Sequence, residues 1–489
     1  MTAVQENVAG DSPVKGSDEI NILQSTSTAP PDEMDAATST TTRTSRTASD
    51  TSDLLPEQHT GTSKSSSSSS TLFRKMKADN LQNGKHKQMT ALLDGSMGRQ
   101  LCEEFKLPTD DFWFPKIWSA AALVKPEFHT AVVEAHKSYI EAGATLITTN
   151  SFGTQPTFYP RAFGEDEWES RMLADAELSS KLAVQARNEA NSTNDVKIIG
   201  SLPSLFESHR PDIFLKNVEE KGEEFVVHYY HKIAEALLRG GADAILFETI
   251  NCWEEAALGL EGISRLPQEM QPEIIVALEG AFRNLNLKPN PHLSAHAFRA
   301  LLPRFALFDT LPEHLATAVS LSPEEHATAF EEKKGNLLDP KTAVICHKAE
   351  PAKLQVSCFG FNCAPPEEIL DSLRAVRNDS VLHEIVTVSG LELCAYANVN
   401  DRKEAHDNGF EVRKDRASAI KKRTDLAREI SPAENGAATD DKENPPKKHY
   451  AYDGYVDLVC EMVDAGATIV GGCCGCGPEG IHALGHRFF

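Results

Sequence analysis

The chain has 489 residues and a formal net charge of −23, with 40% hydrophobic and 25% charged residues. This charge argues against nucleic acid or an anionic membrane as the main partner, because both repel an acidic surface. No run of about 18 apolar residues occurs, so we expect no membrane span.

The N-terminus has neither the apolar core of a signal peptide nor the Arg-rich, acid-poor makeup of a transit peptide, which predicts a cytoplasmic protein. The ten cysteines would stay reduced in that compartment. Clustered cysteines therefore indicate metal ligands or catalytic groups before they indicate disulfides.

Residues 1–88 predict a disordered tail. Ser and Thr dominate this stretch, which includes the homopolymer Ser65–Ser70. Such a composition cannot bury enough apolar surface to offset the entropy lost on ordering. A passive tail and a phosphorylation target both agree with it.

From Thr90 onward the chain contains an internal repeat. Three segments share it: YIEAGATLITTN, LLRGGADAILFET and MVDAGATIVGGCC. In each, an amphipathic run stops at a glycine and a short β-rich run follows; the glycines are Gly143, Gly241 and Gly466. The pattern predicts a helix, a glycine C-cap in the left-handed region and a buried parallel strand.

The helices and strands add up to a closed barrel. Pro126 suits a first helical position, and apolar residues recur at helical spacing from Phe128 to Tyr139 and again from Tyr455 to Val463. We expect eight buried strands, at 90–93, 145–149, 196–200, 243–248, 273–278, 354–360, 391–397 and 467–472. Eight alternations of strand and helix predict an α/β fold of the (β/α)₈ TIM-barrel type over 89–489.

Two insertions interrupt this pattern, at 281–350 and 400–449. The first contains a helical patch around Pro323–Lys333, and the second contains the low-complexity run SPAENGAATDDKENPPKK. We expect both to lie outside the barrel wall and to carry no site.

Polar or thiol groups follow five of the expected strands. They are Asp94, Thr149-Asn150, Glu248-Thr249, Asn362-Cys363 and Cys473-Cys474. Barrel enzymes place their active sites at the C-terminal ends of the strands, so these groups should face one mouth.

Three of these groups are thiols: Cys363, Cys473 and Cys474. Three protein ligands with a fourth position for water or substrate is the pattern of a catalytic zinc, whereas a structural zinc takes four. The alternative for the vicinal pair is a tightly packed strand end or a thiol pair open to oxidation.

A family resemblance joins these features. The words that carry it are LLDGSMGRQL, IWSAAAL followed by Pro126 and His136, AGATLITTNSFGTQ, GSLPS, ADAILFETI, GFNCAPPEEI and GGCCGCGPEGI. In order and spacing, from about Thr90 to His486, they resemble the homocysteine S-methyltransferase family. That family shares its domain with betaine–homocysteine methyltransferase and with the homocysteine module of cobalamin-dependent methionine synthase.

The resemblance implies roles for individual residues. Cys363, Cys473 and Cys474 match the family's zinc ligands, and Asp94 and Glu248 match acidic positions that receive the amino group of homocysteine. The alternative for each carboxylate is an ordinary strand-end cap. Asn150 is a further candidate substrate contact.

Cys476 departs from the family, which usually has Thr at this position. A fourth thiolate could close the metal's coordination shell or could point away. We expect it to point away, because Cys474-Gly475-Cys476 would need a sharp reversal to bind one ion twice.

The implied reaction makes methionine. Binding to Zn²⁺ would deprotonate the homocysteine thiol, and its sulfur would displace a methyl group from a cationic donor such as S-methylmethionine, S-adenosylmethionine or betaine. A sulfonium donor is preferred, since the chain shows neither cobalamin and folate domains nor the C-terminal extension of betaine enzymes.

Aromatic residues are candidates for holding the cationic donor. Trp118 either offers it an aromatic face or packs the barrel rim. Phe152 and Tyr159 are weaker candidates. No histidine has a convincing catalytic context, and we expect His136 and His231 to lie on helix surfaces or in packing.

Three rival functions remain. A selenocysteine or other thiol methyltransferase would use the same zinc site. A metal-dependent hydrolase would need carboxylate or histidine ligands. A non-catalytic zinc or redox sensor would use Cys473, Cys474 and Cys476 as a thiol switch. The oligomeric state and the roles of the tail and the insertions stay open.

Overall fold

The computed structural model describes residues 72–82, 89–192, 194–280, 291–319, 352–399 and 452–489. All of these belong to one unit, Ser68–Phe489. Most of the expected tail, the Pro323–Lys333 patch and the 400–449 insertion lie outside the described residues.

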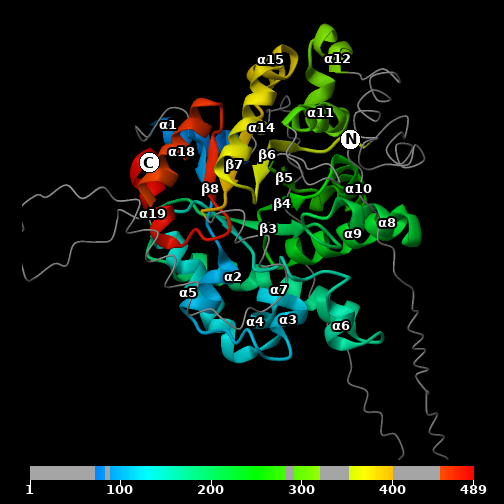
Figure 1. Cartoon of the computed structure of the whole chain (residues 1–489), viewed down its shortest axis with the longest axis vertical. Coiled ribbons are helices and arrows are strands. Elements are labelled where there is room, and N and C mark those ends of the chain that lie inside the picture. The colour runs from blue at the N-terminus through cyan, green and yellow to red at the C-terminus, as the bar shows by residue number, and fades with distance from the viewer. Residues whose placement is uncertain (1–71, 83–88, 193, 281–290, 320–351, 400–451) are drawn as a thin grey trace, which may run out of the picture. The chain divides into compact units, whose positions relative to one another are not determined.

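Eight parallel strands form the barrel wall (Figure 1). The strands are β1 (Ala91–Leu92), β2 (Leu146–Thr148), β3 (Lys197–Pro203), β4 (Ala244–Ile250), β5 (Glu273–Glu279), β6 (Val356–Asn362), β7 (Glu392–Ala397) and β8 (Ile469–Gly472). They pair in the order β1-β8-β7-β6-β5-β4-β3-β2, and a parallel bridge between Leu93 and Leu146 closes the ring from β1 to β2. The predicted barrel and all eight predicted strands are confirmed.

Helices alternate with these strands and surround them. The α-helices are α1 (Leu72–Gln82), α2 (Met97–Glu103), α3 (Phe114–Ile117), α4 (Ala121–Val124), α5 (His129–Glu141), α6 (Tyr159–Phe163), α7 (Trp168–Glu189), α8 (Pro211–Lys221), α9 (Glu223–Arg239), α10 (Trp253–Ser264), α11 (Pro291–Leu301), α12 (Glu313–Val319), α14 (Pro366–Asn378), α15 (Ser380–Ser389), α18 (Asp453–Asp464) and α19 (Pro478–Phe488). Short 3₁₀ turns are η1 (Trp118–Ala120), η2 (Pro126–Phe128), η3 (Gln268–Met270), η4 (Leu302–Arg304) and η5 (Ala306–Thr310).

The three repeat glycines lie just past the ends of α5, α9 and α18. Their φ angles are +107° at Gly143, +101° at Gly241 and +110° at Gly466. A side chain with a Cβ is disfavoured at these angles, and glycine is not. The predicted glycine caps are therefore confirmed, and each delivers the chain from a helix into a buried strand.

The inside of the barrel is filled by a separate hydrophobic cluster. Each strand contributes one or more buried side chains to it: Ala91, Leu93, Leu146, Ile199, Ala244, Leu246, Ile275, Ala277, Cys358, Cys394, Tyr396 and Ile469. The alternate side chains of the strands pack outward against the helices. This inward layer makes the barrel a packed core below the mouth.

Helix α1 closes the N-terminal end of the barrel. Phe73 and Met76 are buried in the interior cluster. Lys77 forms a 3.0 Å ion pair with Glu392, the first residue of β7, and the backbone N–H of Leu72 donates to Glu273, the first residue of β5. The expected boundary of disorder at residue 88 is thus wrong for 72–82, because two apolar side chains and an ion pair dock this helix.

Part of the first expected insertion belongs to the layer of helices that surrounds the barrel wall. The Phe298 ring of α11 stacks on the Phe359 ring of β6, with centroids 4.3 Å apart, and Ser294 hydrogen-bonds Ser372 of α14. Helix α11 therefore lies outside the strands, as a part of the helical layer, and its apolar face covers them. In the described part of the chain, no helix is long and apolar enough to cross a membrane.

Candidate metal and substrate site

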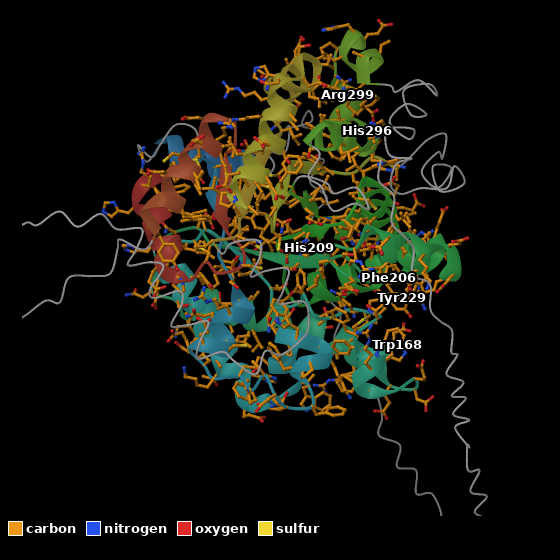
Figure 2. The ribbon with its side chains drawn as sticks, viewed as in Figure 1. Trp168, Phe206, His209, Tyr229, His296 and Arg299 are labelled. Carbon is orange, nitrogen blue, oxygen red and sulfur yellow. The ribbon has the colours of Figure 1, made fainter. Side chains whose placement is uncertain are left out.

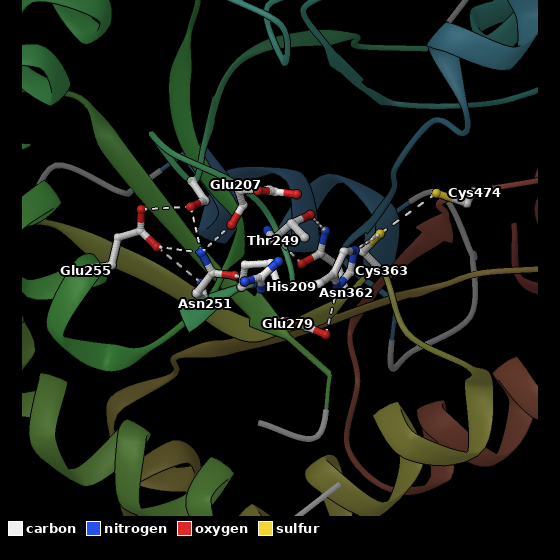
Figure 3. Close-up of polar contacts among 11 residues, drawn as sticks. Glu207, His209, Thr249, Asn251, Glu255, Glu279, Asn362, Cys363 and Cys474 are labelled. Carbon is white, nitrogen blue, oxygen red and sulfur yellow. Dashed lines mark hydrogen bonds and ion pairs between the residues drawn. The ribbon is translucent and has the colours of Figure 1, made fainter. Parts of the chain in front are cut away.

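Three cysteine sulfurs meet at the C-terminal mouth of the barrel. Cys363 follows β6, and Cys473 and Cys474 follow β8; their Sγ atoms all lie within 4.8 Å of one another. The Sγ atoms of Cys363 and Cys474 are 3.8 Å apart (Figure 3). The sequence-predicted cluster is brought together.

Strand β7 lies between the two thiol-bearing strands and holds both of them. The N–H of Cys363 donates to the carbonyl of Tyr396, and the N–H of Cys473 donates to the carbonyl of Ala397. The N–H of Cys474 donates to the side chain of Asn398, just beyond β7. The separation of the sulfurs is therefore set by the backbone of a central strand.

The three thiols share negative charge unequally. Hydrogen bonds from Cys473 and Cys474, together with His209, lower the pKa of Cys363 well below its usual value. The contact with Cys363 in turn raises the pKa of Cys473 and of Cys474. One thiolate is thus stabilised by two thiols, and a soft dication can take the place of the protons between them.

Cys476 points away from this cluster, as expected. It is fully buried, and its side chain occupies the space that a Cβ on Gly472 would need. Gly475 turns the chain with a φ of +85°. Burial raises the pKa of Cys476 to about 12, so it stays a neutral thiol. Its role here is packing at the end of β8.

Glu248 lies on β4, and Asp94 lies just beyond β1 at the same mouth. Glu248 accepts a hydrogen bond from Ser201, and burial raises its pKa to about 7. Asp94 accepts hydrogen bonds from the N–H of Thr148 at 2.9 Å and from its hydroxyl at 2.8 Å. Burial raises the pKa of Asp94, and the charge of Glu248 adds to this. Asp94 is buried and Glu248 is half-buried, and two carboxyl groups that repel each other favour a cationic partner.

Of the remaining candidate substrate contacts, the structure leaves some able to meet a ligand and places others in the packing of the fold. The amide N–H of Asn150 donates to the Ser119 carbonyl at 3.1 Å, and its Oδ1 is buried without a partner among the described residues. Trp118 is half-buried, packs against Gly98 and meets the Phe152 ring edge-on with centroids 5.5 Å apart. Tyr159 is fully buried, and its hydroxyl donates to Asp175 at 3.0 Å. Tyr159 therefore belongs to helix packing, and its proposed role with the donor is wrong.

His209 is a site residue that the sequence analysis missed. Its Nε2 lies 3.7 Å from Cys363 Sγ, and its Nδ1 lies 2.7 Å from Glu279 Oε1 as an ion pair (Figure 3). Burial lowers the pKa of His209, but Glu279 and Cys363 together raise it well above its usual value. Glu279 ends β5, so it carried the same signal as the other strand-end groups; His209 lies in a loop and carried none.

Backbone strain gathers at this mouth. Five described residues other than glycine have positive φ angles, and four of them lie around the mouth: Trp118 at +49°, His209 at +66°, Thr249 at +56° and Cys363 at +53°. The fifth is Lys106 at +58°. Such conformations cost free energy and persist where surrounding contacts hold them. Four residues around the mouth are thus held in unfavourable backbone conformations, which lower the local stability.

Taken as a class, this is a (β/α)₈-barrel enzyme whose mouth carries a three-sulfur cluster and two carboxyl groups, those of Asp94 and Glu248. The family model described as homocysteine S-methyltransferase matches residues 91–488. The chain belongs to that family, and it is a methyltransferase that acts on homocysteine.

Individual relatives are distant. The chain is similar to homocysteine S-methyltransferase YbgG of Bacillus subtilis, with 28% identity over 261 residues, which are 51% of this chain and 75% of that protein. It is also similar to homocysteine S-methyltransferase 1 of Arabidopsis thaliana, with 28% identity over 183 residues, 33% of this chain and 49% of that protein. The match thus spans about half of the plant relative.

Solved structures with similar chains include the homocysteine methyltransferase MmuM from Escherichia coli. Its metallated form has 19% identity and a TM-score of 0.47, covering 84% of this chain and 99% of MmuM. Its oxidised form has 20% identity and a TM-score of 0.46 over 84% of this chain and 99% of that chain.

Proposed function

We propose that the protein transfers a methyl group from a sulfonium compound to homocysteine held at a Zn²⁺ ion on Cys363, Cys473 and Cys474, forming methionine. The observation that supports this proposal is the trio of sulfurs within 4.8 Å of one another at the barrel mouth. Methyl transfer to homocysteine follows from membership of the family. The proposal adds the identity of the metal ion, its three cysteine ligands and the sulfonium class of the methyl donor.

The three cysteine ligands have the geometry and chemistry that zinc requires. Zn–S bonds of about 2.3 Å in a tetrahedron separate two sulfurs by about 3.8 Å. The Cys363 and Cys474 sulfurs are already 3.8 Å apart. Three thiolates are soft ligands that select zinc over magnesium or calcium, and three is the number of protein ligands that a catalytic zinc takes.

The residues of the chain then have separate tasks. Zn²⁺ bound to the three cysteines would supply the deprotonation of the homocysteine thiol at neutral pH. Glu248 and Asp94 bind the ammonium group of homocysteine, since both are carboxyl groups at this mouth whose pKa is raised by burial. Asn150, with its unpartnered buried Oδ1, is a further contact for a donor hydrogen of the substrate.

The methyl transfer requires only homocysteine and the sulfonium donor. A bond forms between the homocysteine sulfur and the methyl carbon, and the bond from that carbon to the donor's positive sulfur breaks. The electron pair leaves with the donor, which becomes a neutral thioether. Trp118, half-buried at the rim, offers an aromatic face for the cation before transfer.

A donor series tests the proposal. The full-length chain loaded with zinc is incubated with homocysteine and, in turn, S-methylmethionine, S-adenosylmethionine or betaine, and methionine is measured. Methionine from either sulfonium compound and not from betaine is the expected result. Turnover with betaine alone would overturn the assignment of the donor. Methionine formation by Cys363→Ala protein would overturn the zinc site.

A further inference from the structure

His209 lies between a buried carboxylate and the sulfur of a proposed metal ligand. Its Nδ1 is 2.7 Å from Glu279 Oε1, and its Nε2 is 3.7 Å from Cys363 Sγ. Glu279 is only 3% exposed in its side chain. The three groups come from three places in the barrel: the loop after β3, the end of β5 and the end of β6.

Each ring nitrogen of His209 therefore faces an acceptor. On one side, Nδ1 lies at ion-pair distance from the carboxylate of Glu279, a group that cannot donate when ionised. A thiolate sulfur on the other side accepts from the Nε2–H.

Apolar packing pins the loop that carries His209. Phe206 is buried, and its ring stacks on Phe225 with centroids 6.0 Å apart and lies 5.9 Å from the Phe214 ring. From Phe225 the aromatic contacts continue to Tyr229 and Trp168 (Figure 2). Three residues before His209, the loop is thus anchored on α8 and α9.

Buried and partly buried hydrogen bonds also hold the same loop, from residues at the end of β4 and in α10. The Asn251 side chain accepts from the N–H of Arg210 at 3.1 Å and donates to the carbonyl of Glu207 at 2.9 Å (Figure 3). Glu255, also buried, accepts from the hydroxyl of Ser204 and the N–H of Leu205. Glu207 and Arg210, which flank residues 208–209, are therefore both held by Asn251, in the short link between β4 and α10.

The backbone of His209 is strained in this position, with a φ of +66°. A residue with a Cβ adopts this conformation only where other contacts compensate it. The ion pair with Glu279 and the contact with Cys363 are contacts of that kind. The unfavourable backbone conformation of His209 is thus held by contacts that direct its ring at the sulfur.

We propose that His209 is a positioning residue of the metal centre: held by Glu279, it donates its Nε2–H to the sulfur of Cys363 and fixes the direction in which that sulfur faces the metal. The inference rests on the proposed function, since it requires Cys363 to be a metal ligand. A hydrogen bond to a ligand atom from outside the coordination shell changes metal affinity about 10- to 100-fold in other metal sites.

Cobalt substitution tests the proposal with a readout other than activity. Full-length protein is loaded with Co²⁺, and its sulfur-to-metal charge-transfer absorption is recorded. In a separate measurement, the affinity for Zn²⁺ is determined by competition with a chelator. We expect His209→Phe to shift the absorption and to weaken zinc binding about tenfold. The amide nitrogen of the His209→Gln variant reaches the place of Nε2. This variant should keep the wild-type absorption and a zinc affinity within about threefold of the wild type. Glu279→Gln should shift the absorption while the imidazole is still present.

The controls are His383→Phe and His383→Gln on the exposed face of α15, and urea unfolding reports whether each variant is folded. Wild-type absorption and affinity in folded His209→Phe protein would overturn the proposal. An imidazole signature in the zinc X-ray absorption that disappears in His209→Gln would also overturn it, because His209 would then be a ligand itself. Wild-type protein that binds no metal would contradict the proposed function instead.

Discussion

Asn362 clasps Thr249 across the barrel mouth. The Asn362 Oδ1 accepts from the N–H of Thr249, and its Nδ2 donates to the Thr249 hydroxyl, both at 2.9 Å. Both side chains are at most 1% exposed. Asn362 directly precedes Cys363, and Thr249 directly follows Glu248. The proposed metal ligand and the proposed substrate carboxylate therefore share one buried support.

Removing this clasp should weaken the fold and the site together. Asn362→Ala leaves the N–H and hydroxyl of Thr249 buried without partners, at a cost of about 1–3 kcal/mol for each lost partner. We expect a lower free energy of unfolding in urea and a reduced zinc content. Asn378→Ala, at the exposed end of α14, is the control. Equal stability of the two variants would show that the clasp is not needed.

The sulfur ligands should separate cleanly from the fourth thiol. Cys363→Ala, Cys473→Ala and Cys474→Ala are each expected to lose zinc on dialysis, because two remaining thiolates do not hold the ion. Cys476→Ala should keep about one zinc per chain, since its sulfur packs against Gly472. Metal content by elemental analysis checks this. Zinc loss in the Cys476 variant alone would reverse the ligand assignment.

Glu248→Gln should reveal the carboxylate that binds the amino group of homocysteine. The amide can keep the contact with Ser201 but has no charge for an ammonium group. A hydrogen bond to a charged group contributes about 1.5–3 kcal/mol, so we expect the KM for homocysteine to rise about 10- to 100-fold. Steady-state kinetics measure it, with exposed Glu219→Gln on α8 as the control. An unchanged KM would leave Glu248 as a strand-end cap.

His136 should make the protein sensitive to acid. It is fully buried in α5, neither ring nitrogen has a partner among the described residues, and burial lowers its pKa from 6.5 to about 3. The folded state therefore resists protonation, and its stabilisation is present above pH 6.5 and is lost as the pH falls toward 3. One such group lowers the free energy of unfolding by about 1.4 kcal/mol per pH unit in this range.

His136→Leu should remove this contribution and flatten the dependence. Urea unfolding at pH 7, 5 and 4 measures it, with exposed His383→Leu as the control. If the slopes of the His136 and His383 variants coincide, His136 is not the acid-sensitive group.

Helix α1 should contribute to the stability of the whole barrel. Phe73 is 1% exposed within the interior cluster, so Phe73→Ala is expected to cost about 3–5 kcal/mol. Exposed Lys75→Ala on the same helix is the control. Thermal unfolding of the full chain reports both. A melting temperature shared by the two variants would show that α1 is not docked on the barrel.

Local patterns carried the prediction of the fold. Gly143, Gly241 and Gly466 end helices because only glycine adopts their φ angles freely, and apolar runs after them become strands buried on both sides. The docking of α1 and α11 was not predictable in the same way. Each depends on a few side chains, such as Phe73 and Phe298, that meet strands far away in the chain.

The proposed site divides along the same line. Sequence alone placed Cys363 and the Cys473–Cys474 pair at strand ends, and a parallel barrel must bring all strand ends to one face. Only the tertiary structure decided that Cys476 turns into the packing, that Asn362 clasps Thr249 and that His209 reaches Cys363. These relations depend on loop conformation and side-chain direction across strands, which no local pattern of residues encodes.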